Sequence, residues 1–337
     1  MANPWIFEWY DADQDLRPLV WRRAIGKAPV NVDPPVPVSF VLSNPTEGRS
    51  VRFRSLLGGS GPPYVPVNQE IPFEPGSRLN FINVNEAQVD LKVLFKYDSQ
   101  DLLWAQLRTL PYIFNPLRGQ GTLKVTNPGL AIRYLDCVCI SGFKIDESTL
   151  QEKSVEATLS FWANNPYWYS DWTSTTLNYM QITQGALPIL PSTLVRSPGD
   201  LAAGYAITNN GDVNSKMVVI VSGPYKNPIV QNTSVTLPTP NPQVNLSNNG
   251  GLNNTLDNPT TIDFLNKTIL ISTGVGGVLR IGIQYLTTTS TFWSLKPGLN
   301  NLQFQIQRPT VPTGQPQPTL QDTKISFCFR SAYSTMI

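Results

Sequence analysis

The sequence predicts a mainly β fold with a single α-helix. Apolar and polar side chains alternate in many short segments, and this period of two is typical of half-buried strands. The chain also contains 30 Pro and 23 Gly, which favour a structure rich in turns. At 337 residues it is too long for one ordinary hydrophobic core, so we expect two domains.

The first domain is predicted over residues 1–180 as a β domain with one helix. Residues 131–141 are apolar on both faces, which indicates a strand at the centre of a sheet. Residues 58–77 are rich in Gly and Pro, and we expect a long loop there. The strands of this domain are predicted at residues 38–42, 51–57, 88–96, 121–125, 131–141 and 151–161.

The one helix is predicted over residues 99–110, with Asp98 or Ser99 as its cap. Its leucines recur at spacings of four and three residues, which is the pattern of a buried helix face. We expect Pro111 to end the helix, and we expect the helix to cover a face of the sheet. The predicted apolar stripe consists of Leu103, Leu107 and Leu110, widened by Leu102 and Trp104.

An aromatic corner follows the last strand of this domain, in the sequence LSFWANNPYWYS at 159–170. Tryptophan and tyrosine dominate the energetics of protein interfaces, so these rings are candidate oligomer-interface residues. The alternative is that they fold back and close their own sheet. Trp168 and Trp172, at the edge, are the stronger interface candidates. The full candidate set is Trp162, Tyr167, Trp168 and Trp172.

A second all-β domain is predicted over residues 204–337, after a weakly patterned linker at 181–203. The charge composition changes between the halves, since residues 1–180 carry 16 basic and 18 acidic side chains and residues 181–337 carry 9 and 5. Short strands separated by turns, such as the tight turn expected at 209–212, indicate a β-sandwich.

Three aromatic residues of the second domain are weak candidates for carbohydrate contact, because aromatic rings stack on sugars. They are Tyr225, Tyr285 and Trp293, and the Asn-rich loop at 245–259 could supply amides to sugar hydroxyls. The alternative is a sandwich that binds no sugar.

The composition argues against several functional classes. The chain has no histidine, which excludes histidine-based nucleophile arrangements and metal sites. Its three cysteines are expected to be small buried hydrophobic residues. A net charge of +2 argues against nucleic-acid binding, and no apolar run is long enough to span a membrane. We therefore predict no catalytic site, no metal and no cofactor, in a soluble protein made in a cytoplasm.

Several motifs, in order along residues 75–337, resemble those of the distal tail protein family of phages with long, non-contractile tails. They begin with Pro75-Gly76-Ser77 before an alternating strand and helix, continue through residues 115–123, and include the aromatic corner. In the second half they are ITNNGD (207–212), GPYKNP (223–228) and TFWSLKPGLNNLQFQI (291–306). The first 75 residues and the loops at 58–77 and 245–259 are longer than the family pattern.

The resemblance implies a ring-forming N-terminal domain followed by a galectin-like β-sandwich. Six copies would form a ring at the virion tail tip, made in the host bacterial cytoplasm. The ring would join the tail tube protein to the tail hub protein, and to a receptor-binding protein or tail fibre. A carbohydrate-binding adhesion module is the alternative, although galectin sugar sites depend on a histidine that this chain lacks. A tail-associated hydrolase is the third hypothesis.

Overall fold

The chain forms two compact units, each with its own hydrophobic core. The structure, a computed structural model, describes residues 5–10, 39–41, 50–58, 61–70, 77–127, 129, 131–178, 201–235, 242–254, 258–273, 278–307, 309–311, 313–314 and 323–336. The first unit comprises the described residues up to Asp171 and those from Tyr333 onward; the second comprises those of Trp172–Ala332. The predicted boundaries at 180 and 204 stay predictions, because residues 179–200 lie outside the described part.

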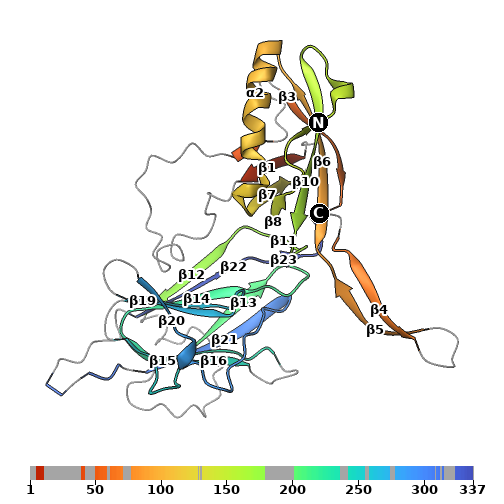
Figure 1. Cartoon of the computed structure of the whole chain (residues 1–337). Coiled ribbons are helices and arrows are strands. Elements are labelled where there is room, and N and C mark those ends of the chain that lie inside the picture. The colour runs from red at the N-terminus through yellow and green to blue at the C-terminus, as the bar shows by residue number, and fades with distance from the viewer. Residues whose placement is uncertain are drawn as a thin grey trace. The chain divides into compact units, whose positions relative to one another are not determined.

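A curved antiparallel sheet forms the body of the first unit (Figure 1). The strand order is β2-β1-β7-β8-β10-β6-β3, which places β8 between two neighbours, as its two apolar faces predicted. The main strands are β1 (Ile6–Tyr10), β2 (Ser39–Val41), β3 (Ser50–Leu57), β6 (Ala87–Lys96), β7 (Gly121–Thr126), β8 (Ile132–Cys139) and β10 (Ser154–Ala163). Three two-residue strands extend it, namely β9 (Lys144–Ile145), β11 (Trp168–Tyr169) and β23 (Ala332–Tyr333).

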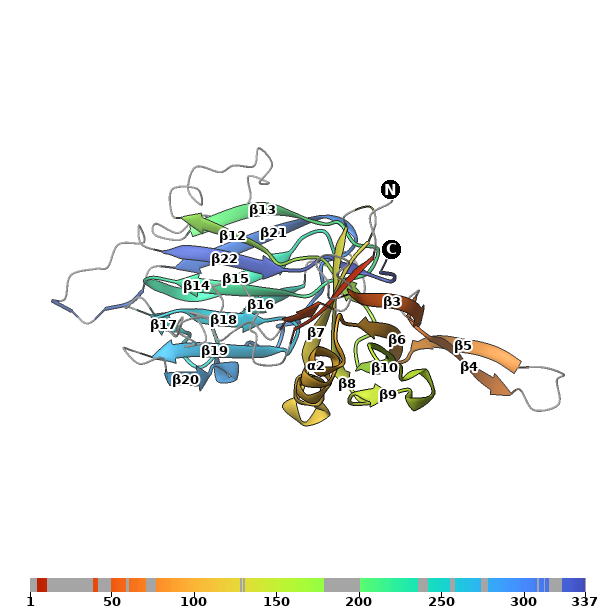
Figure 2. The ribbon, with the colours of Figure 1, turned by 90° about the horizontal axis from the view of Figure 1, so that it is seen from above.

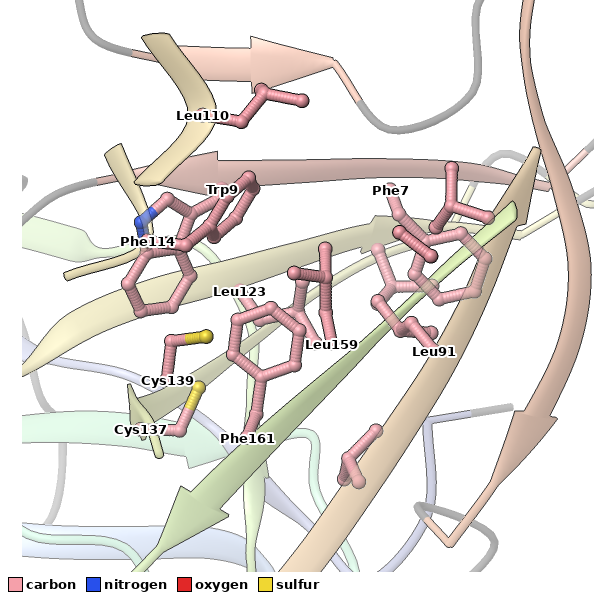
Figure 3. Close-up of a cluster of buried hydrophobic side chains, with 14 of the residues drawn as sticks. Phe7, Trp9, Leu91, Leu110, Phe114, Leu123, Cys137, Cys139, Leu159 and Phe161 are labelled. Carbon is pink, nitrogen blue, oxygen red and sulfur yellow. The ribbon is translucent and has the colours of Figure 1, made fainter. Parts of the chain in front are cut away.

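The alternating strands supply one face each to the core of this unit (Figure 3). In β10 and β6, which pair over ten residues, every second side chain is buried. Aromatic rings from separate elements meet in the core, with the ring centroids of Trp9 and Phe161 5.0 Å apart. Cys137 and Cys139 are free, buried thiols within it. Burial raises the pKa of Cys139 to about 11, so the expectation that these cysteines are inert hydrophobic residues is consistent with their environment.

Helix α2 (Gln100–Ile113) covers this core, and it is the one α-helix among the described residues. Ser99 caps it, accepting a hydrogen bond from the backbone N–H of Leu102 at 3.3 Å. Leu103, Leu107 and Leu110 are buried, as predicted. Two expectations about the helix were wrong: Pro111 lies inside its last turn, and Leu102 and Trp104 do not widen the buried stripe.

A separate two-stranded ribbon takes up part of the segment predicted as a loop at 58–77. Strand β4 (Tyr64–Glu70) pairs with β5 (Ser77–Val84), and the ribbon projects from the sheet in Figures 1 and 2. Proline is tolerated at position 66 because a two-stranded ribbon leaves outward backbone positions without a strand partner. The Gly and Pro content of the segment suggested a loop, but the alternating apolar residues after Pro63 form a strand.

The second unit is a β-sandwich, as predicted. One sheet has the order β12-β22-β14-β18-β19-β20 and the other β13-β21-β15-β16, with β17 paired to β15. The strands of the first sheet are β12 (Thr173–Asn178), β14 (Met217–Ser222), β18 (Thr260–Asp263), β19 (Thr268–Thr273), β20 (Val278–Ile281) and β22 (Lys324–Phe329). Those of the second are β13 (Leu201–Asn209), β15 (Tyr225–Asn232), β16 (Gln243–Asn245), β17 (Asn253–Asn254) and β21 (Gly298–Gln307).

The turn predicted at 209–212 is held by the side chain of Asn209, which is buried. Its amide donates to the carbonyl oxygen of Val213 at 2.8 Å, and its Oδ1 accepts from the backbone N–H of Gly211 at 3.1 Å. Gly211 lies against the backbone of Ala332, where a side chain would collide with the carbonyl group. This close approach explains why the turn carries Asn and Gly at these positions.

Candidate assembly surfaces and aromatic sites

The aromatic corner is organised by asparagine side chains after β10. Trp162 donates its indole N–H to Oδ1 of Asn164 at 3.2 Å. Asn165 accepts from the backbone N–H of Tyr167 at 3.3 Å and donates to the hydroxyl of Tyr169 at 2.7 Å. Trp162 and Tyr167 are half-buried. The corner is therefore a fixed turn whose outer rings retain some exposed surface.

Trp168 points into the core of the first unit and is 1% exposed. The short strand that carries it, β11, pairs with β8 and β23, so residues from the C-terminal end of the chain complete this part of the sheet. Met336 belongs to the same core cluster. The position of Trp168 corresponds to the alternative in which its indole ring closes its own domain. A role of Trp168 in an oligomer interface stays a prediction.

Trp172 is half-buried and belongs to the second unit. The guanidinium of Arg330 lies 4.7 Å from the centroid of its ring, a cation–π contact. The ring packs against Val218, Ile220 and Cys328, which form a small buried cluster separate from the core of the sandwich. Burial raises the pKa of the Cys328 thiol to about 12. Trp172 is thus less exposed than its sequence position at the edge of the corner suggested.

The three carbohydrate candidates do not form an open site. Tyr225 is fully buried in the sandwich core, and its hydroxyl donates to Oγ1 of Thr260. Burial raises the pKa of Tyr225 to about 12. Trp293 is also buried, with its ring centroid 4.6 Å from that of Phe264, whereas Tyr285 is half-buried at the rim of the core. A ring packed in a core has no free face to offer a sugar, so the carbohydrate assignment stays a prediction that these positions do not favour.

Several asparagines in the described part of the loop at 245–259 bind the protein's own backbone. Asn248 and Asn249 both donate to the carbonyl oxygen of Gln284, at 3.3 and 3.0 Å. Asn253 exchanges two hydrogen bonds with the backbone of Thr310, donating at 2.8 Å and accepting at 2.9 Å. These amides hold the loop in place, which accounts for the abundance of Asn without a ligand.

The face of the first sheet that points away from the core carries ion pairs. Lys124 on β7 pairs with Glu8 on β1, and Lys92 on β6 pairs with Glu156 on β10 at 3.0 Å. Burial alone would lower the pKa of Lys124, but the hydrogen bond and charge of Glu8 outweigh it and the pKa is raised. Paired charges of both signs satisfy this face locally and give it no strong attraction for a charged ligand.

Two parts of the first unit expose large apolar side chains that the sequence did not single out as interface candidates. We call the first the hairpin patch, which consists of Tyr64, Val65, Phe81 and Ile82 on β4 and β5. The second part is α2 with the following turn η1 (Pro116–Arg118), where Leu102 and Trp104 are exposed on opposite sides of the buried leucines and Tyr112 and Leu117 are exposed beyond them. The sequence signal for the hairpin patch was its lack of charge, since the described side chains at 64–68 and 80–84 include none.

The described residues were compared with two kinds of functional feature, a metal site and a membrane-spanning helix. Among the described residues, no group of three or more His, Cys, Asp or Glu side chains is placed to hold a metal ion. No helix in the same set is both long and apolar enough for a membrane crossing.

Comparison with known proteins gives matches in fold alone. No protein-family model matches the chain, and neither does any curated protein sequence. The crystal structure of the Dit protein of phage SPP1, described as a paradigm of the hub adsorption apparatus in phages of Gram-positive bacteria, matches with a TM-score of 0.53. The match has 13% identity and covers 83% of this chain and 93% of that chain.

Two structures of the phage P2 baseplate in its activated conformation, with Ca and with Sr, also match, at TM-scores of 0.49 and identities of 9% and 10%. Each of these matches covers 91% of this chain and 99% of that chain. The resemblance that the sequence motifs predicted is confirmed at the level of the fold: the chain has the fold of a phage distal tail protein.

Proposed function

We propose that this chain is a structural protein of a phage tail tip. The observation that carries the proposal is the fold shared with the SPP1 Dit protein over 83% of this chain, across both of its units. The motifs that first indicated the family lie within both units as well, from Pro75 to the strand β21. Fold alone does not define function, so the surfaces must support the same conclusion.

The surfaces support assembly rather than chemistry. The first unit exposes large apolar side chains on the β4–β5 ribbon and along α2 and η1, and exposed apolar surface on a folded protein commonly marks a protein–protein interaction site. The carbohydrate candidates are buried or half-buried, and the asparagines nearby bind backbone groups. We therefore propose a scaffold role and no catalytic activity.

In its finer form the proposal is a hexameric ring that joins the tail tube protein to the tail hub protein, with a receptor-binding protein or tail fibre attached. A ring requires a heterologous contact, in which two different surfaces of each copy meet, and it closes when the rotation between copies closes. Exposed apolar side chains on two different elements of one unit, the β4–β5 ribbon and α2, are compatible with such a contact. The number of copies and the adjoining proteins come from the family resemblance.

Two measurements test this proposal. Native mass spectrometry of the full chain at high concentration should give the mass of an oligomer. Negative-stain images of the same sample should show rings. Antibody labelling of tail particles from the phage that encodes the chain should place it at the tail tip. Absence from tail particles, in a chain that also stays monomeric, would overturn the proposal. Binding of the full chain to a glycan array, with no place in the tail, would favour the adhesion-module alternative.

A further inference from the structure

The chain contains two Asn-Asn-Gly sequences, and the structure places them in opposite environments. One ends at Gly211 in the turn after β13, and the other ends at Gly250 in the loop after β16. Asparagine followed by glycine is a sequence prone to deamidation, because glycine has no side chain to shield its backbone nitrogen from the side-chain carbon of the asparagine. Since the two sequences are so similar, a difference in their reactivity must come from the fold.

The backbone nitrogen of Gly211 is held within its turn. Its N–H donates to Oδ1 of Asn209 at 3.1 Å, and the glycine is buried. A Cβ at Gly211 would lie 1.8 Å from the carbonyl oxygen of Ala332, so the backbone has no room to move in that direction. Asn210 is also fixed, because its backbone N–H donates to Oγ of Ser331 at 3.0 Å. The nitrogen of Gly211 cannot approach the Asn210 side chain without breaking these contacts.

The second pair is open to water. Asn249 and Gly250 are both exposed, and a Cβ at Gly250 would meet nothing within 4 Å. Among the described residues, no group accepts a hydrogen bond from the backbone N–H of Gly250. The backbone is left-handed over three consecutive residues, with φ of 50° at Asn249, 80° at Gly250 and 82° at Gly251. Two adjacent glycines give this segment the freedom to bring the Gly250 nitrogen to the Asn249 side chain.

The side chain of Asn249 also fastens its loop to the rest of the sandwich. Its amide donates at 3.0 Å to the carbonyl oxygen of Gln284, which lies in the short 3-10 helix η3 (Ile283–Tyr285). Beside this bond, the backbone N–H of Asn248 donates to the carbonyl oxygen of Tyr285 at 3.0 Å. A carboxylate at position 249 has no proton to donate and would repel the carbonyl oxygen of Gln284. Attachment of the loop 246–252 therefore depends in part on an amide at this position.

We propose that Asn249 is a site of deamidation and that its conversion releases the loop 246–252 from η3. The backbone nitrogen of Gly250 attacks Cγ of Asn249, a C–N bond forms, and the side-chain nitrogen leaves as ammonia with the proton of the attacking N–H. Water then opens the succinimide ring by breaking one of its C–N bonds, which yields aspartate or isoaspartate. The product adds a negative charge to the loop, and isoaspartate also lengthens the backbone by one carbon atom. The inference is independent of the proposed function.

Peptide mass spectrometry of the full chain tests the site. The folded protein is incubated in mildly alkaline buffer, and the tryptic peptides that contain the two Asn-Gly pairs are quantified over time. Labelling with isoaspartyl methyltransferase identifies isoaspartate. We expect Asn249 to convert roughly tenfold faster than Asn210, which is the size of protection that one retained hydrogen bond can supply. The matched control is the same incubation in urea, where both pairs are unfolded and should convert at similar rates.

Three results would overturn the inference. The first is equal rates at Asn249 and Asn210 in the folded protein, and the second is a folded protein in which neither asparagine converts. The third is a difference that persists in urea, because the local sequence and not the fold would then set the rate.

Hydrogen exchange of the variant Asn249→Asp tests release of the loop. The variant imitates one product, and Asn210→Asp is the control because it puts the same charge into the other pair. The backbone N–H groups of Gly251 and Leu252 donate to carbonyl oxygens inside the loop at 2.8 and 3.0 Å, so loosening should speed their exchange. We expect faster exchange over 246–252 in Asn249→Asp alone, with circular dichroism melting to check that both variants fold. Unchanged exchange in Asn249→Asp, or the same increase in both variants, would refute the release.

Discussion

Replacing Trp168 by alanine should strongly destabilise the first unit. The side chain is 1% exposed and lies in the core of that unit, and a buried aromatic side chain removes about 150–250 Å² from water. At roughly 25 cal/mol per Å² this burial corresponds to about 4–6 kcal/mol, an upper estimate because unfolded chains bury part of the same area. Measured losses for Phe or Trp to alanine, about 3–5 kcal/mol, give the expected magnitude.

The matched control is Trp162→Ala, six residues earlier in the same aromatic corner. Trp162 is half-buried and its indole N–H bonds to a neighbouring asparagine, so we expect a loss of about 1 kcal/mol. Urea unfolding of the full chain, followed by tryptophan fluorescence and by circular dichroism, should separate the transitions of the two units. The difference should appear in the transition of the first unit.

The result that would refute this reasoning is a small loss for Trp168→Ala. If the free energy of unfolding of that variant fell by less than about 1 kcal/mol while the oligomeric ring failed to form, the Trp168 side chain would be an interface anchor and not part of a domain core. A loss of stability in the second unit would equally contradict the placement of Trp168. Such outcomes would revive the interface hypothesis for this residue.

Three further predictions follow from the same structure. Burial raises the pKa of the Cys328 thiol to about 12, so the neutral thiol stabilises the folded state fully below the ordinary thiol pKa of 9, and this stabilisation is lost as the pH rises towards about 12. The free energy of unfolding from urea titrations should fall by about 1.4 kcal/mol per pH unit above pH 9 from this group, and Cys328→Ala should flatten that slope. Gly211→Ala would place a Cβ 1.8 Å from the carbonyl oxygen of Ala332 and should cost about 2 kcal/mol or more, whereas Gly61→Ala meets nothing within 4 Å and should melt like the parent. Ser99→Ala removes the cap of α2 and should lower the stability of the first unit by about 1 kcal/mol, and a thermal midpoint that does not move would argue against the cap.

The sequence by itself determined the local elements wherever the period was clear. Strand β6 and strand β10 were predictable because burial on one face imposes a period of two, and α2 because its three leucines share one side of a helix. The boundaries of α2 were predicted less well. Pro111 was expected to stop the helix, but the helix continues to Ile113, and the backbone N–H of Phe114 still donates to the carbonyl oxygen of Leu110 at 2.9 Å.

The pairing of distant segments was decided by the tertiary structure alone. Nothing in the local pattern of Trp168 distinguishes a core ring from an interface ring, because its burial depends on β8, β23 and Met336, which come from far along the chain. The same holds for Tyr225 and Trp293, whose faces are covered by strands of the opposite sheet and by neighbouring loops. Composition cannot predict whether such a side chain is buried, since burial depends on which distant segments pack against it.

What the sequence determined about this protein is its β-rich class, its single predicted helix and the ordered motifs of the distal tail family. What only the tertiary structure decided is which apolar residues remain outside. Leu102, Trp104 and Leu117 had the composition of a core, yet they lie exposed beside the buried leucines of α2. The physical reason is that a helix packed on one sheet buries only one side, and Leu102 and Trp104 lie on the two flanks of the stripe formed by Leu103, Leu107 and Leu110, each about 100° around the helix from it.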